Sequence, residues 1–332
     1  MTRTSITPKP LQPGSHIRVV APSVSLPFVE RGDAGAYVVD CASHRFEQMG
    51  LQVSFGAHVR EADSFFTSSI ESRVADLHEA FADPTVDGIM TVIGGYNSNE
   101  LLPYLDYELI AANPKFVCGF SDITALHNAI YAKTGLITYS GPHWSTFGMR
   151  DHFEVTHASF MQAAFSRDPI EWVPTNWFTD DLWFLQQDDR HRLSTDGWWT
   201  IQPGKADGIA LGSNLSTLAL LNGTDYLPDL DGSVLFVEET SNSDITEFRR
   251  MLVSVLQQCG AENITALVIG RFQVASQVTR SDVEQTVASL PWLKGIPVLA
   301  NVDFGHTTPL LTFPIGGRAQ VDADAHRMTF QR

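Results

Sequence analysis

Strand-like and helix-like segments alternate along the first 135 residues, and this alternation restricts the fold more than any other feature. The expected order is strand 17–22, helix 34–49, strand 51–55, helix 67–82, strand 86–93, short helix 99–105, strand 115–120 and helix 122–134. Such a pattern predicts an α/β fold with a parallel sheet covered on both faces. Ligands bind at the carboxyl ends of the strands in such sheets, so residues just after each strand are the first candidates for function.

The segment 117–122, Val-Cys-Gly-Phe-Ser-Asp, follows one of these strands and presents Ser121 at the start of a helix. A tight turn of this kind holds a serine side chain out of the sheet, and the next backbone N–H groups point at the same space. Taken alone, a serine before Asp-Ile-Thr is more typical of a helix N-cap. A serine hydroxyl becomes a nucleophile only with a base and a group that orients the base.

The second half of the chain contains residues that fit both roles. An apolar strand from Ser233 ends in Glu238 and Glu239, and His306 lies in a loop shaped by glycine and proline just after another strand. We expect His306 to take the Ser121 proton and return it to the leaving group. A carboxylate on the far ring nitrogen would fix the histidine tautomer. Of the two glutamates we favour Glu238, because it comes first after the strand.

The backbone N–H groups of Asp122 and Gly95 are predicted to form the oxyanion hole, in which one donor is typically worth ~3 kcal/mol. Each motif also has an ordinary structural explanation. A Gly94-Gly95 pair is usually a turn, a single loop histidine is usually structural, and a glutamate pair is usually a solvated strand end. Cys118 is a possible rival nucleophile, but a cysteine within an apolar strand is more often buried and inert.

Composition excludes several classes of function. The net charge of −16 disfavours binding to nucleic acid. The three cysteines form no CxxC pair and the histidines show no HExxH spacing, so no metal site or disulfide framework is predicted. No stretch approaches ~20 apolar residues, so no membrane span is expected. Residues 1–10 contain no apolar signal region, which predicts a cytoplasmic protein.

Three segments are expected along the chain, whose 332 residues suggest about two domains. Residues 1–150 form the α/β domain with the Ser121 turn. Residues 151–206 break the alternation, contain five of the seven tryptophans and are interpreted as a linker and substrate loop. Residues 207–332 form a β-rich domain with a helix over about 244–259.

Together the motifs resemble the LD-carboxypeptidase family of serine peptidases, from about residue 14 to 332. The segments that carry the resemblance are 94–97, 101–106, 119–126, 141–142, 212–216, 235–239, 250–252 and 303–316. The resemblance implies a Ser–Glu–His triad with Ser121 as nucleophile, Glu238 as the glutamate and His306 as base. It also implies an N-terminal domain resembling class I glutamine amidotransferases, a cytoplasmic homodimer, and no metal or other cofactor. The α/β-hydrolases share this chain order, but Gly119-Phe-Ser-Asp-Ile lacks the second glycine of their GxSxG turn.

Two branches of this family differ in substrate. One trims the terminal D-alanine from murein tetrapeptides. The other resembles the microcin C self-immunity peptidase, which cleaves the amide between an acidic aminoacyl or peptidyl group and a modified adenylate. The second branch has a longer aromatic loop whose tryptophan can stack on adenine, an interaction worth ~1–3 kcal/mol. Residues 176–183 and Trp198-Trp199 match that loop, although these tryptophans would equally serve to pack the linker or a dimer interface.

We therefore predict an amidohydrolase of the microcin C immunity branch, acting in antibiotic self-immunity or detoxification. Trp177, Trp183, Asn214 and Glu239 are the predicted substrate-binding residues; at 212–214 the chain has Gly-Ser-Asn where Gly-Gly-Asn is usual. One alternative is a murein tetrapeptide LD-carboxypeptidase acting on a muropeptide. Another, of a different class, is a non-catalytic protein that binds a peptide-nucleotide.

Overall fold

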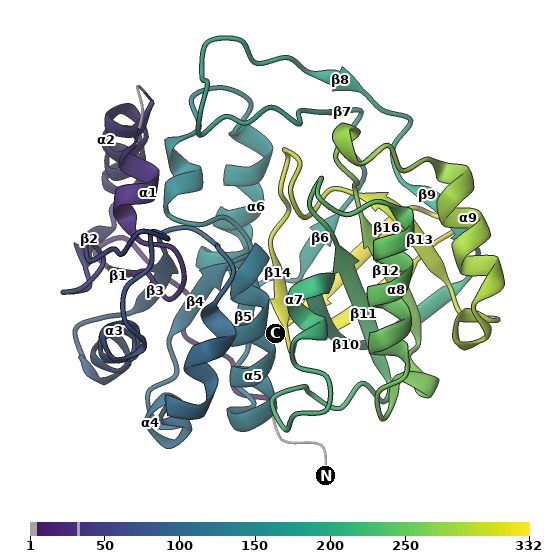
Figure 1. The fold of residues 1–332 in the computed structure, drawn as a ribbon, viewed down its shortest axis with the longest axis horizontal. Helices are drawn as coiled ribbons and strands as arrows, with labels where there is room; N and C mark the ends of the chain where they lie inside the picture. Colours follow the sequence, from purple (N-terminus) through teal and green to yellow (C-terminus); the bar gives the residue numbers. More distant parts are fainter. Residues whose placement is uncertain (1–4, 32–33) are drawn as a thin grey trace.

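The computed structural model describes residues 5–31 and 34–332, so the first four residues of the predicted signal-free N-terminal segment lie outside the described part. Two sheets lie side by side, each with its own helices (Figure 1). The first sheet has the order β14 (Phe313–Ile315), β5 (Thr138–Ser140), β4 (Phe116–Gly119), β3 (Gly88–Thr91), β1 (His16–Val20) and β2 (Gln52–Phe55). Strands β1 to β5 are parallel, whereas β14 is antiparallel to β5.

Helices connect the parallel strands as the alternation predicts. They are α1 (Leu26–Glu30), α2 (Gly35–Gln48), α3 (Ile70–Ala82), the 3₁₀ helix η1 (Ser98–Tyr104), α4 (Tyr107–Ala112), the 3₁₀ turn η2 (Ser121–Ile123) and α5 (Thr124–Thr134), and a 3₁₀ helix η3 (Ser145–Gly148) follows β5. Local chemistry sets several ends: the Ser69 hydroxyl accepts a hydrogen bond from the Ser72 N–H and begins α3, and α5 ends at Gly135, whose φ of 77° suits glycine. The predicted helix at 99–105 is a 3₁₀ helix that contains Pro103.

The second sheet is mixed. Its order is β6 (Ile170–Trp172), β16 (Arg327–Gln331), β15 (Arg318–Asp322), β10 (Lys205–Asn214), β11 (Ser233–Glu238), β12 (Ala266–Gly270), β13 (Val298–Val302) and β9 (Trp199–Gln202). The central strands β10 to β13 are parallel and the outer pairs are antiparallel. Its helices are α7 (Leu215–Ala219), α8 (Ile245–Leu256) and α9 (Arg280–Ser289), with short 3₁₀ turns at 261–263, 274–276 and 291–293. The predicted two-domain α/β architecture is confirmed, and its β-rich half is a mixed sheet with crossover helices.

The segment 151–206 contains more regular structure than a linker. It includes α6 (Glu154–Phe165), the edge strands β6 and β9, and a hairpin of β7 (Trp177–Phe178) and β8 (Leu193–Ser194). Strand β14 also departs from the expected division, because it lies within 207–332 but pairs with β5 of the first sheet. No helix in the described residues is long and apolar enough to cross a bilayer.

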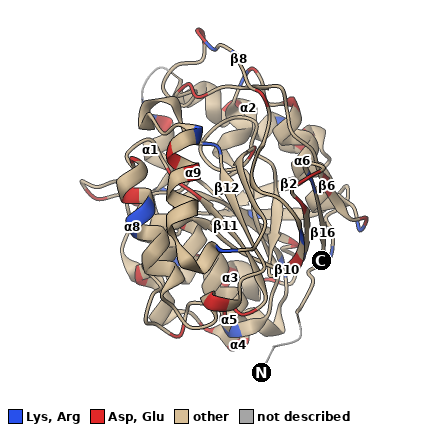
Figure 2. Cartoon of the chain, turned by 90° about the vertical axis from the view of Figure 1, so that its right-hand side faces the viewer, with Lys and Arg blue, Asp and Glu red and all other residues tan. Residues whose placement is uncertain are grey.

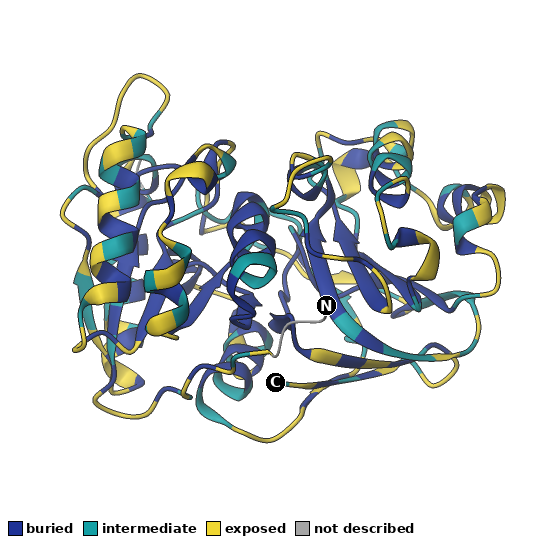
Figure 3. Ribbon diagram, turned by 90° about the horizontal axis from the view of Figure 1, so that it is seen from below, coloured by how far each residue is buried: buried dark blue, intermediate teal, exposed yellow. Residues whose placement is uncertain are grey.

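The central strands of both sheets (β3, β4, β11, β12 and β13) are buried, whereas the edge strand β2 and strands β15 and β16 have exposed positions, as do the helices and loops (Figure 3). A cluster of aromatic rings fills the boundary between the sheets: Phe313 of β14 stacks on Phe236 of β11 at 4.5 Å, and Trp172 of β6 packs against both. Trp172 and Trp198 are 1% and 2% exposed, so packing explains these two tryptophans. Figure 2 shows Asp and Glu on many helices and loops, consistent with the net charge of −16.

Candidate active site

Ser121 lies on a strained turn at the carboxyl end of β4. Its φ of 59° is in the left-handed region, which costs a residue other than glycine roughly 1–3 kcal/mol. Two glycines make the turn possible. A Cβ on Gly119 would lie 2.3 Å from Thr91 Oγ1, and a Cβ on Gly94 would lie 3.0 Å from Ser121 Cβ. Glycine at both positions therefore leaves room for the half-buried Ser121 on this turn.

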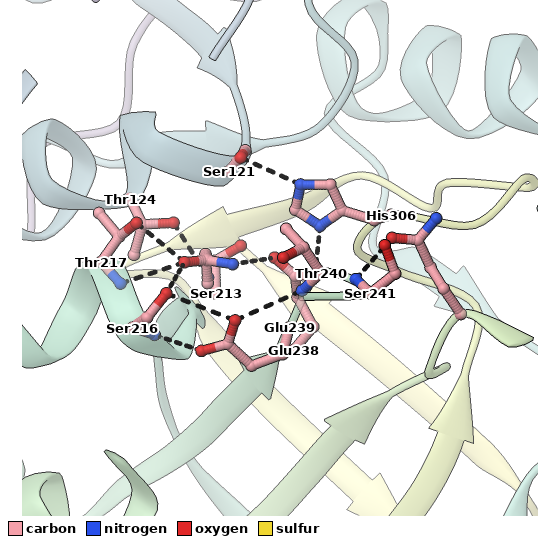
Figure 4. A network of polar contacts seen from close by, with 12 residues as sticks. Ser121, Thr124, Ser213, Ser216, Thr217, Glu238, Glu239, Thr240, Ser241 and His306 are labelled. Carbon is pink, nitrogen blue, oxygen red and sulfur yellow. Dashed lines mark hydrogen bonds and ion pairs between the residues drawn. The ribbon is translucent and has the colours of Figure 1, made fainter. Parts of the chain in front are cut away.

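His306 connects Ser121 to Glu238 by two hydrogen bonds (Figure 4). Its Nε2 lies 3.0 Å from Ser121 Oγ, and its Nδ1 lies 2.7 Å from Glu238 Oε2. Glu238 is the last residue of β11 and is 1% exposed. A Cβ on Gly305 would lie 2.5 Å from Glu238 Oε2, so the glycine before His306 allows this close approach. The structure thus brings together the three residues predicted to act in series.

The glutamates favour the protonated form of His306. Burial by itself lowers the pKa of His306, but the charge of Glu238, the hydrogen bond to it and the charge of Glu239 together raise that pKa above its ordinary value. Burial and the neighbouring Glu238 charge raise the pKa of Glu239, and the Ser216 N–H and hydroxyl partly oppose this. The site is therefore built to stabilise an imidazolium, the form that a base takes after it receives the serine proton.

Asn214 holds Glu238 in place. Its Nδ2 donates to Glu238 Oε1 at 3.1 Å, while its Oδ1 accepts from the Thr217 N–H, the Thr217 hydroxyl and the Ser216 hydroxyl. Glu239 accepts from the Ser216 N–H at 2.7 Å and is 2% exposed. Asn214 and Glu239, predicted to contact substrate, thus lie behind Glu238 and are not among the residues that line the cavity in front of Ser121.

That cavity has a volume of about 290 Å³ and a largely apolar wall. Its lining includes Val24, Phe28, Ile93, Phe120, Met149, Leu182, Trp183, Phe184 and Leu310, with the polar residues His143, Ser145, Thr146, Thr179, Asp181 and Thr307. Trp183, which the sequence predicted to contact substrate, lines this cavity. Trp177 is not among the lining residues, and its ring instead packs 3.9 Å from the Arg192 guanidinium.

The loop with the predicted oxyanion donor is tied to the Ser121 turn. The Ser98 N–H donates to Asp122 Oδ2 at 2.8 Å, and the Ser98 hydroxyl donates to the Asp122 carbonyl at 2.6 Å. Gly95 lines the cavity and has a φ of 153°, and a Cβ there would lie 2.2 Å from Ser23 Oγ. These contacts fix the loop after Gly95 against Asp122, the residue that follows Ser121.

Other candidate groups have different environments. Cys118 is fully buried, and burial raises the pKa of its thiol, which makes it a poor nucleophile. Within 5–31 and 34–332, no three His, Cys, Asp or Glu side chains are grouped so as to hold a metal ion. Sequence reasoning missed His143, which lines the cavity beside Ser121. It follows β5 at the same sheet edge, so the strand-end rule applied to that strand would have found it.

A serine, a histidine and a buried glutamate in hydrogen-bonded series beside a cavity are the arrangement of a serine hydrolase. Family comparison narrows this class. The LD-carboxypeptidase N-terminal domain matches residues 17–141, and the LD-carboxypeptidase C-terminal domain matches residues 207–321. The chain belongs to the LD-carboxypeptidase family, as the sequence motifs predicted.

Individual relatives agree with this assignment. The chain is 45% identical to "Putative carboxypeptidase YocD" of Bacillus subtilis (strain 168), over 94% of this chain and 95% of the relative. It is 32% identical to microcin C7 self-immunity protein MccF of Escherichia coli, over 84% and 83% of the two chains. The crystal structure of an MccF-like protein from Bacillus anthracis str. Ames superimposes with a TM-score of 0.95 at 45% identity, covering 98% of this chain and 99% of that one.

Proposed function

We propose that this chain hydrolyses an amide bond through a Ser121 acyl-enzyme. The observation that carries the proposal is the continuous hydrogen-bonded series from Ser121 through His306 to Glu238 at the cavity. Ser121 Oγ attacks the carbonyl carbon while its proton passes to His306 Nε2. The Asp122 and Gly95 N–H groups stabilise the oxyanion. His306 then protonates the leaving amine, and water clears the acyl group by the reverse proton path.

We further propose that the substrate joins an acidic aminoacyl or peptidyl group to a modified adenylate. Trp183 and Phe184 form an aromatic wall in the cavity, which suits a stacked base. Solved structures of MccF include a complex with aspartyl sulfamoyl adenosine; that protein superimposes with a TM-score of 0.86 at 26% identity and 98% coverage of both chains. Because the chain resembles this family, we also propose that it forms a homodimer in the cytoplasm. Sedimentation of the purified protein checks the dimer.

The test combines two variants with two substrates. Ser121→Ala and His306→Ala, measured separately, should each lose nearly all turnover, and near-wild-type turnover in either would refute the series as the catalytic machinery. The wild-type enzyme should hydrolyse aspartyl- or glutamyl-sulfamoyl adenosine. Hydrolysis of only a murein tetrapeptide would refute the proposed substrate class but not the proposed mechanism. Tight binding of these compounds with no hydrolysis of any amide would indicate a binding protein.

A further inference from the structure

His143 is a buried histidine in the cavity to which the proposed mechanism gives no role. It follows β5, is 2% exposed, and lines the cavity together with Ser121 and His306. Phe120 packs against both histidines: its ring lies 4.5 Å from the His143 ring and 5.2 Å from the His306 ring. Both imidazoles thus contact the residue that precedes the nucleophile.

A hydrogen bond fixes the orientation of the His143 ring. Its Nδ1 lies 2.6 Å from Thr91 Oγ1, at the carboxyl end of β3. The Thr91 hydroxyl has one proton, and its other acceptor, the Cys118 carbonyl, is 3.5 Å away, at the limit of a hydrogen bond. We therefore assign the Thr91 proton to His143 Nδ1, which makes Nε2 the protonated nitrogen.

The His143 Nε2 atom lies close to the nucleophile. A Cβ built on Gly94 would be 3.4 Å from His143 Nε2 and 3.2 Å from Ser121 Oγ, so both atoms border the same small space beside the Gly94 backbone. Among the described residues, Nε2 has no hydrogen-bond partner within the chain. When Ser121 attacks a carbonyl carbon, the carbonyl oxygen lies near this space, and an N–H group on His143 Nε2 can reach it.

The environment keeps His143 uncharged. Burial, with the charges of His306 and His127, lowers the pKa of His143 well below its ordinary value. A neutral imidazole does not compete with His306 for the Ser121 proton, and it does not repel the imidazolium that His306 becomes. The described residues that line the cavity include no Lys or Arg, so uncharged N–H and O–H groups must supply hydrogen bonds to a developing negative charge there.

We propose that His143 is a third hydrogen-bond donor to the carbonyl oxygen of the scissile amide, beside the Gly95 and Asp122 N–H groups. The inference rests on the proposed function and adds a residue to it. As Ser121 Oγ bonds to the carbonyl carbon, the carbonyl π electrons move to oxygen, and the His143 Nε2–H group hydrogen-bonds to that oxygen without transferring its proton. The proton released from Ser121 goes to His306 alone.

The test compares variants that keep or remove this donor. Glutamine can place an N–H group near the position of His143 Nε2, whereas leucine cannot. His143→Leu should lower kcat by about 10²–10³-fold with KM changed less than about threefold, the range for loss of one oxyanion donor. His143→Gln should recover at least tenfold of that loss. His157→Leu makes the same change at a half-buried histidine outside the cavity and should leave kcat unchanged.

Equal kcat in wild type and His143→Leu, or equal loss in His143→Leu and His143→Gln, would overturn the inference. If His143→Leu fails to fold, Thr91→Val and Thr91→Ser replace it: valine removes the proton that fixes the tautomer and should lower kcat, and serine should retain it. A wild-type enzyme that hydrolyses no amide refutes the proposed function itself. A wild-type enzyme that needs Ser121 but not His143 refutes this inference alone.

Discussion

Replacement of Glu238 by glutamine should disable the enzyme through the wrong histidine tautomer. The new side chain keeps the size of glutamate but has one acceptor and one donor end. Asn214 decides which end faces His306. Because Asn214 Oδ1 already accepts from three groups on Thr217 and Ser216, its amide cannot rotate, and its Nδ2 donor must face residue 238. The glutamine oxygen therefore faces Asn214, and its NH₂ group faces His306 Nδ1.

An N–H donor opposite Nδ1 makes that nitrogen an acceptor and leaves the His306 proton on Nε2, toward Ser121. His306 then has no free electron pair with which to take the serine proton. The matching change in serine proteases lowers kcat by about 10⁴-fold, which corresponds to roughly 5.5 kcal/mol in the activation free energy. We expect a loss of that order in kcat, measured by release of the leaving amine, with an unchanged melting temperature.

Asn214→Asp provides a specific rescue. An aspartate at 214 still accepts from Thr217 and also accepts from the glutamine NH₂ group, so the glutamine oxygen can turn to His306 Nδ1. Glu238→Gln combined with Asn214→Asp should exceed Glu238→Gln alone by at least tenfold in kcat. Asn214→Asp alone sets two buried carboxylates face to face and should lower both activity and stability. Activity of Glu238→Gln within tenfold of wild type would refute the tautomer argument.

Three further predictions concern pH and stability. Glu238 and Glu239 raise the pKa of His306, and the base must be neutral, so kcat/KM should fall as pH drops through a value above 6.5. Glu239→Gln should move this acidic limb of the pH profile to lower pH. A limb that does not move contradicts the charge effect. Ser121→Gly should raise the free energy of unfolding by about 1 kcal/mol, because glycine adopts a φ of 59° without strain. Ser121→Ala keeps the strain and should not raise it. Equal melting temperatures of the two variants would contradict this prediction. Asp303→Asn breaks a buried ion pair with Arg271 and should lower the free energy of unfolding, measured in urea, by about 3–5 kcal/mol. Asp207→Asn breaks the more exposed pair with Arg318 and should lower it by less than ~1 kcal/mol. Equal losses would show that burial does not set the penalty.

The regular elements were predictable because short-range patterns determine them. Apolar runs ended by glycine or proline mark the strands, and the helices between them carry apolar residues at helical spacing. The predicted functional residues follow the same logic, since Ser121 and Glu238 lie at strand ends, where a parallel sheet presents side chains. The structure brings these two together with His306 because the ends of β4 and β11 face the same space.

Residue type alone did not distinguish the tryptophans. Trp172, Trp183 and Trp198 lie in one stretch of similar composition, yet two are in the core and one lines the cavity. Long-range pairing makes this difference: Trp172 is buried because β6 pairs with β16, which lies more than 150 residues later in the chain. A weak local signal was present, since Ile170, Glu171 and Trp172 alternate apolar and charged as an edge strand does. Asn214 shows the same limit, because only the position of Glu238 reveals that the Asn214 amide donates a hydrogen bond to it.

The course of the chain around His306 explains how a site shared by two sheets keeps its geometry. The loop that carries His306 leaves β13 of the second sheet and enters β14, which is the edge strand of the first sheet. Each end of the loop is therefore anchored in a different domain. At its start, Asp303 accepts hydrogen bonds from Trp198 Nε1 and Thr175, and at its end Phe313 packs on Phe236. A relative movement of the two sheets would have to break the β14–β5 pairing or this aromatic contact before it separated His306 from Ser121. The loop from β13 to β14 thus crosses between the sheets, which is why local sequence does not predict the pairing of β14. The same loop holds His306 3.0 Å from Ser121, which is 185 residues away in the chain.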